Sequence, residues 1–479
     1  MNRLSGLDAS FLYLESSSQL LHVCGIVMVS PDTTPGGYSF SKMKDELERR
    51  VSVVPSFRQK LRHVPLHLGH PVWVEDEDFD IDRHVHRLAV PSPGGDEELS
   101  ELAGHLAGIP LDRSRPLWEM WVIEGLASGQ VAIFSKLHHA TVDGVSGSNL
   151  ISHLCSLEPD APSPDGTEAD ADDVQRDPGD VELAARGLVS LASRPMEIAK
   201  VLAPAAGMLA NWVGRAREGT AMTAPFTAPR TSFNVTVTGH RSVAFAEFGL
   251  DDVKRIKDAT GTTVNDGVLA LCSGALRRYL SARDELPSSS LVAMVPVSVH
   301  ETSKREEGTN KVSGLFANLG TDIEDPLERL EAISASNVNA KEHHHAIGAD
   351  TLQDWAEFAA PRTFGLAVRV YSKLRLAERH PVVHNLVISN VPGPPVPIYW
   401  MGAKVDALYP LGPVFHGAGL NITVISNNGR INVGLIACRE LVPAVWELAH
   451  AIPDELESLL EAATTSTAKP GRGRSTRVE

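Results

Sequence analysis

The sequence is poor in cysteine, has no long apolar run and carries no excess of basic residues. Its four cysteines (Cys24, Cys155, Cys272 and Cys438) lie far apart without a C-x-x-C pair, which argues against a disulfide scaffold and favours a reducing cytosol. The start of the chain lacks the basic and apolar regions of a signal peptide, and no apolar stretch of about 18 residues could span a bilayer. The formal net charge of −16 argues against nucleic-acid binding. We therefore expect a cytoplasmic protein that binds no nucleic acid.

The negative charge is concentrated in one segment. Residues 158–182 contain ten acidic residues and one arginine, which accounts for more than half of the net charge. Its central part has few large apolar residues, so it cannot bury a core and is expected to be a linker. With 479 residues, 43% of them apolar, the chain is long enough for two or three domains. The predicted organisation is an N-terminal domain (1–157), an acidic linker with crossing helices (158–230), a C-terminal domain (231–465) and a basic disordered tail (466–479).

A histidine pair lies at a predicted strand-to-helix junction. Residues 131–137 are short, β-branched and mostly apolar, which is typical of a buried strand. Residues 145–154 carry apolar side chains at helical spacing. His138 and His139 therefore fall where α/β proteins commonly place reactive groups. Because consecutive strand side chains point to opposite faces, only one of the two imidazoles is expected to enter a pocket.

The residues around the pair suit base catalysis. A neutral imidazole can take a proton from a hydroxyl or thiol as that group attacks a carbonyl. Asp143 is close enough to brace the loop, and Gly144 allows the backbone to approach a substrate. No G-x-S-x-G motif supplies a nucleophile, so direct transfer is favoured over a covalent triad. The alternative is that the histidines are structural; no metal site is expected, because no further zinc ligands stand at suitable spacing.

Residues 138–144 resemble the H-H-x-x-x-D-G motif of chloramphenicol acetyltransferase and of peptide-synthetase condensation domains. Other segments make the chain similar to the bacterial wax ester synthase/acyl-CoA:diacylglycerol acyltransferase (WS/DGAT) family. They are Leu-Ser-Gly-Leu-Asp-Ala-Ser-Phe at 4–11, Pro116-Leu117-Trp118-Glu119, Asn265-Asp266 and Ser-Asn-Val-Pro-Gly-Pro at 389–394. Their order and spacing match the family, and together they cover nearly the whole chain.

The resemblance implies an α/β (α+β) fold of two chloramphenicol-acetyltransferase-like domains. Each would be a mixed β-sheet flanked by helices, with the active-site channel at their interface, and only the first half carries the histidine motif. His139 would be the general base. The other implied site residues are His138 and Asp143 as catalytic residues, Gly144, Pro116, Leu117 and Trp118 as supports of the motif, and Asn265 and Asp266 in the substrate channel. Because Asp266 lies in the first turn of a predicted helix, local capping is an alternative role for it.

The resemblance also implies an acyl-CoA-dependent O-acyltransferase. The acceptor would be diacylglycerol, giving triacylglycerol, or a long-chain alcohol, giving a wax ester. Acyl-CoA is then a co-substrate, and no cofactor is required. The rival is a non-catalytic lipid-binding or scaffolding protein of the same fold. Because these substrates partition into lipid, we expect peripheral contact with the inner face of the membrane or with lipid droplets through residues 188–213, although that segment could instead pack between the domains.

Local patterns give further expectations. Residues 116–124 predict a strand paired with 131–137, and two apolar runs flanking Asn427-Asn428-Gly429 predict a hairpin. The basic stretch 57–61 could meet a coenzyme A phosphate, but a solvated surface is favoured. His84 and His86 are expected on the surface of a strand.

Overall fold

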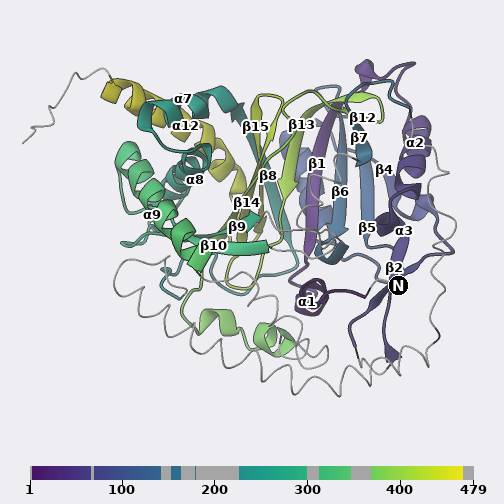
Figure 1. Ribbon diagram of the computed structural model, residues 1–479, viewed down its shortest axis with the longest axis horizontal. Helices are drawn as coiled ribbons and strands as arrows, with labels where there is room; N and C mark the ends of the chain where they lie inside the picture. The colour runs from purple at the N-terminus through teal and green to yellow at the C-terminus, as the bar shows by residue number, and fades with distance from the viewer. Residues whose placement is uncertain are drawn as a thin grey trace, which may run out of the picture.

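Two mixed β-sheets stand next to each other, and the helices α7, α8, α9 and α12 lie beside the second sheet (Figure 1). The computed structural model describes residues 3–65, 69–141, 153–162, 179, 226–298, 312–346 and 368–467. The combination of two mixed sheets with flanking helices confirms the expected α/β fold class.

The first sheet has seven strands in the order β4-β5-β6-β1-β13-β12-β7. Strands β4 and β5 run parallel, and the other neighbours are antiparallel. Its central strands are buried on both faces, which explains their near-continuous apolar sequence. The strands are β1 (His22–Ser30), β4 (Val85–Ala89), β5 (Trp118–Glu124), β6 (Val131–His138), β7 (Cys155–Ser156), β12 (Tyr399–Trp400) and β13 (Ala403–Leu411), with a separate pair, β2 (Gln59–Arg62) and β3 (Val72–Glu75).

The second sheet has six strands in the order β10-β9-β11-β14-β15-β8. Strand β11 runs parallel to both of its neighbours. The hairpin between β14 and β15 turns at Asn428 and Gly429, whose φ angles of 44° and 81° are those of a two-residue turn with left-handed backbone. The strands are β8 (Arg241–Gly249), β9 (Val292–Ser298), β10 (Val312–Asn318), β11 (Leu386–Val391), β14 (Leu420–Asn427) and β15 (Arg430–Cys438).

The helices fall into two groups along the chain. Those beside the second sheet are α7 (Leu250–Thr260), α8 (Val264–Ser281), α9 (Pro326–Ala346) and α12 (Val445–Thr467). Those in the first part of the chain are α1 (Gly6–Leu14), α2 (Phe40–Ser52), α3 (Pro55–Arg58) and α4 (Asp96–Ala107). Short 3-10 turns are η1 (Pro31–Thr33), η3 (Ile81–Arg83), η4 (His139–Thr141) and η6 (Leu376–Glu378).

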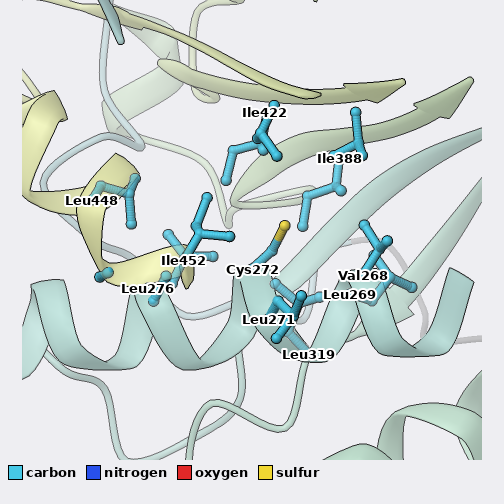
Figure 2. Close-up of a cluster of buried hydrophobic side chains, with 14 of the residues drawn as sticks. Val268, Leu269, Leu271, Cys272, Leu276, Leu319, Ile388, Ile422, Leu448 and Ile452 are labelled. Carbon is cyan, nitrogen blue, oxygen red and sulfur yellow. The ribbon is translucent and has the colours of Figure 1, made fainter. Parts of the chain in front are cut away.

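The second sheet packs its core against α8 and α12. Figure 2 shows Cys272 of α8 between Ile388 of β11 and Ile422 of β14, with Ile452 of α12 close by. These side chains are almost completely buried. Burial of each large aliphatic side chain contributes about 1.5–3 kcal/mol, so this cluster holds the later part of the chain together.

The two sheets meet where β13 approaches β14 and β15. Leu408 N of β13 donates to Asn432 Oδ1 of β15 at 3.2 Å. A Cβ atom at Gly434 of β15 would lie 2.0 Å from the carbonyl oxygen of Pro410, so this close approach requires glycine. Residues 399–411 belong to the predicted C-terminal domain but complete the first sheet. The first sheet therefore contains strands from both predicted domains. The boundaries of those domains stay a prediction.

The segments with regularly spaced apolar residues form the helices and strands that were predicted for them. Met43, Leu47 and Val51 form the buried face of α2, β5 pairs with β6, and the hairpin is present. No strand was predicted at β13, in which Lys404, Asp406 and Pro410 stand between apolar residues. The helix expected after residue 144, most of the linker, the segment 188–213 and the tail after 467 lie outside the described residues. In the part of the chain that the structure describes, no helix is long and apolar enough to cross a membrane.

We expect Gly434→Ala to destabilise the protein by about 1–3 kcal/mol, seen as a lower melting temperature. Alanine normally stabilises a strand interior relative to glycine by about 0.5–1 kcal/mol, but here its Cβ would meet a backbone oxygen at 2.0 Å. Gly25→Ala is the matched control, because a Cβ on this β1 residue would meet nothing nearer than 3.6 Å. Equal melting temperatures for the two variants would contradict the close contact of the sheets.

Candidate active site

Backbone hydrogen bonds anchor the turn that carries the histidine pair on both sides. Strand β6 ends at His138, and His139 begins η4. His138 N donates to Leu117 O at 3.0 Å, and His139 N donates to Leu21 O at 2.9 Å. The chain therefore leaves the sheet between the two histidines, and their rings lie in different surroundings.

The His138 ring faces the interior. It is 1% exposed, and its Nδ1 accepts a hydrogen bond from Ala140 N at 3.0 Å. Since Nδ1 acts as an acceptor, the neutral ring carries its proton on Nε2. Nε2 lies 3.5 Å from Glu15 Oε2. His138 is therefore held between its own turn and the end of α1.

The His139 ring is partly exposed and stacks on Phe11 of α1. The ring centroids are 4.0 Å apart and the planes are inclined by 22°. Nδ1 is buried without a hydrogen-bond partner among the described residues, so Nε2 is the nitrogen that can meet a substrate. Burial lowers the pKa of His139 to about 4, and the ring is neutral at physiological pH. This is the protonation state that a general base requires.

A buried carboxylate, Glu15, lies between three basic groups. Its side chain is 9% exposed. Oε1 lies 3.1 Å from His22 Nε2, and Oε2 contacts His138 and the guanidinium of Arg113. Arg113 also donates to Leu12 O at 3.0 Å. His22 and His138 are directly opposite each other in the β1–β6 pair, so the register of that pair assembles the cluster.

The pKa shifts of Glu15 and His22 agree with this geometry. Burial alone would raise the pKa of the Glu15 carboxyl, but contacts with His138, His22 and Arg113 hold it well below its usual range. Burial lowers the pKa of His22 to about 4 despite the nearby carboxylate. At neutral pH the cluster therefore holds an ionised Glu15 beside a neutral His22. Glu15, His22 and Arg113 were not among the predicted site residues, because the local sequence does not show that strands 22–30 and 131–138 pair.

The Pro116-Leu117-Trp118 segment supports the histidine turn through its backbone and its packing. Leu117 supplies the carbonyl that His138 N meets. The Trp118 side chain is 1% exposed and its Nε1 donates to Phe57 O at 2.8 Å. His84 stacks on Trp118 with ring centroids 4.5 Å apart, and its Nδ1 lies 2.8 Å from Trp118 O. The expectation that His84 occupies a strand surface was wrong, because its ring fills the space beside this tryptophan.

A fully buried lysine lies two residues before His138 on β6. Lys136 Nζ donates to Ile109 O at 2.9 Å and to Leu106 O at 3.3 Å. It also lies 3.3 Å from Glu119 Oε2 and 4.7 Å from the centroid of the Trp121 ring. These partners compensate the buried charge, so Lys136 fixes the connection after α4 to the histidine strand.

Asn265 and Asp266 begin α8 and have different partners. Asp266 forms a capping box with Thr263, and Asn337 Nδ2 of α9 donates to its Oδ1 at 2.7 Å. These contacts match the capping role proposed as an alternative. Asn265 Oδ1 instead accepts a hydrogen bond from Asn390 Nδ2 at 3.3 Å. Asn265 therefore joins α8 to the Ser-Asn-Val-Pro-Gly-Pro segment, and the substrate-channel role of both residues stays a prediction.

Other predicted features are less informative about the chemistry. Asp143 and Gly144 lie outside the described residues. In the basic stretch, Arg58 pairs with Glu75 at 2.9 Å and Lys60 with Asp76 at 2.7 Å, which leaves little unpaired positive charge for a phosphate. A polar crevice of about 160 Å³ beside Lys60 and His84 contains neither histidine of the pair. Within the described residues, no group of three or more side chains is placed to hold a metal ion.

Comparisons with known proteins place this geometry in one family. The family model described as the wax ester synthase/diacylglycerol acyltransferase catalytic domain matches residues 4–268, and that of the WS/DGAT C-terminal domain matches 308–460. A Mycobacterium tuberculosis protein provisionally named a diacylglycerol O-acyltransferase is 47% identical over 97% of this chain and 91% of its own length. Another from the same species, named with the same activity, is 36% identical over 95% and 98%.

Solved structures give the same result. The wax ester synthase/diacylglycerol acyltransferase from Marinobacter aquaeolei is 31% identical, with a TM-score of 0.69 over 97% of this chain and 100% of that one. The first condensation domain of the calcium-dependent antibiotic synthetase has a TM-score of 0.56 at 13% identity, over 98% and 97%, which shows a shared two-domain fold. The chain therefore belongs to the wax ester synthase/diacylglycerol acyltransferase family and is an O-acyltransferase.

Proposed function

We propose that this protein transfers a fatty acyl group from acyl-CoA to the free hydroxyl of diacylglycerol, giving triacylglycerol. Relatives named diacylglycerol O-acyltransferases support this choice of acceptor. A long-chain alcohol is the second acceptor, supported by the similarity to a wax ester synthase/diacylglycerol acyltransferase. The observation that carries the proposal is the partly exposed, neutral His139 directly after β6, whose Nδ1 is buried so that Nε2 is left to meet the substrate.

The reaction is a direct transfer with His139 as general base. Nε2 removes the proton of the acceptor hydroxyl while the oxygen attacks the thioester carbonyl. The new ester C–O bond forms and the C–S bond breaks, and the proton passes from the imidazolium to the sulfur of coenzyme A. The lowered pKa of His139 keeps the ring unprotonated before the reaction and makes the imidazolium a stronger acid, which gives its proton readily to the thiolate. No covalent acyl-enzyme and no cofactor is needed.

An assay with radiolabelled acyl-CoA tests this function. Purified protein is given diacylglycerol or a long-chain alcohol in mixed micelles, and the labelled ester is separated from free fatty acid. We expect labelled triacylglycerol at a rate that rises with both substrates, and a wax ester from the alcohol. Tight binding of lipid without any ester product would favour the rival function, a non-catalytic lipid-binding or scaffolding protein.

We expect His139→Ala to lower kcat by a factor of about 10²–10⁴, because it removes the proton acceptor. His138→Ala should lower kcat less, because its ring holds the turn and does not face a substrate. Both variants must first show wild-type circular dichroism and melting behaviour. Equal and small losses for the two folded variants would contradict the general-base assignment.

We also propose a peripheral contact with the membrane or with lipid droplets through residues 188–213. The support is chemical: both substrates partition into lipid, and the segment carries Met208, Leu209 and Trp212 between charged residues. Replacing Leu209 and Trp212 with serine should reduce co-sedimentation with liposomes while the melting temperature barely moves. A variant that melts early but binds as well per folded molecule would instead assign the segment to the protein core.

A further inference from the structure

We propose that Glu15 is a positioning residue of the acyl transfer, which holds the histidine turn in its reactive geometry by binding the ring of His138. This inference rests on the proposed role of His139. Glu15 itself is placed to touch the two buried histidines, His22 and His138, and the partly exposed Arg113.

The first step of the argument is the tautomer of His138. Because Ala140 N donates to Nδ1 at 3.0 Å, the ring is a hydrogen-bond acceptor on the side of the turn. Its protonated Nε2 then lies on the side of Glu15, with Oε2 3.5 Å away. A carboxylate is an acceptor at neutral pH, whereas a neutral acid or amide could also present a donor there. An ionised Glu15 therefore favours one tautomer, and that tautomer is the one that can bind Ala140 N.

The second step connects His138 to His139. Ala140 follows His139 directly in η4, so the hydrogen bond from Ala140 to the His138 ring spans the catalytic residue. If the His138 ring turns or changes tautomer, this bond is lost and the turn can relax. The side chain of His139 would then move relative to the substrate, and a displacement of about 1 Å can cost about 10²-fold in rate.

The third step is that one helix controls both rings. Phe11 of α1 stacks on His139, and Glu15 follows the last residue of α1. Arg113 donates to Leu12 O and contacts Glu15, which fixes the end of the helix against the segment before β5. Figure 1 shows α1 near the ends of the strands of the first sheet. The partly exposed Arg113 thus holds the Glu15 carboxylate, and the carboxylate in turn holds the buried ring of His138.

The test compares Glu15→Gln and Glu15→Asp with the wild type. Glutamine keeps the size of the side chain but loses the charge, and we expect kcat to fall by about 10–100-fold with KM for acyl-CoA changed less than about threefold. Aspartate keeps the charge with a shorter reach, and its kcat should lie between the two. Glu455→Gln is the matched control. Glu455 is also buried and paired with an arginine, Arg329, but it lies on α12 beside the second sheet. This variant should lose stability and keep its kcat per folded molecule.

A double-mutant comparison separates positioning from general loss of structure. If Glu15 acts through His139, adding Glu15→Gln to His139→Ala should cause less than a further twofold loss of residual activity. If the double variant instead lost activity by the product of the two single losses, the inference would be overturned. A kcat for folded Glu15→Gln within twofold of the wild type would also overturn it. If Glu15→Gln fails to fold, a kcat for Glu15→Asp equal to that of the wild type would overturn it. Absence of ester product with the wild type would instead count against the proposed function.

Discussion

The register between β1 and β6 is the constraint on which the site depends. It sets His22 directly opposite His138, so that one carboxylate can lie between both rings. A shift of one residue would turn these side chains to the opposite face of the sheet. The pairing is strongly specified because both strands are apolar and buried on both faces. The same burial that stabilises the sheet therefore fixes the position of the polar groups at its end.

The histidine pair also shows why the site needs the strand to end where it does. In a continuing strand, His139 would point away from His138 and its backbone would join the ladder. Here the backbone N–H of each histidine is satisfied by a different neighbour, Leu117 or Leu21. The ring nitrogens His22 Nδ1 and His139 Nδ1 are buried without partners among the described residues. Such groups cost about 1–3 kcal/mol each, and the large cores of both sheets offset this cost.

Much of the fold was predictable from periodicity, because single-faced helices such as α2 and apolar strands such as β6 carry their burial in the local sequence. The position of the histidine pair at a strand end was predictable for the same reason. The environment of the pair was not. Glu15, His22 and Arg113 meet His138 only after β1 and β6 pair, and β13 enters the first sheet with Asp406 and Pro410 in its sequence. Local patterns contain no information about such distant contacts, whereas the family resemblance supplied the function.

The second half of the chain lacks a histidine motif of its own, yet it holds the residues that organise the first. The loop between α1 and β1 is fixed from the second half: His416 N donates to Gln19 Oε1 at 2.7 Å, and Arg241 Nη2 donates to Ser18 O at 2.7 Å. Gln19 Nε2 in turn donates to Leu14 O at the end of α1. Because Glu15 and His22 stand at the two ends of this loop, contacts from the second half hold the segment that carries both groups around His138. The catalytic geometry is therefore a property of the two sheets together, although the general base and its turn belong to the first half.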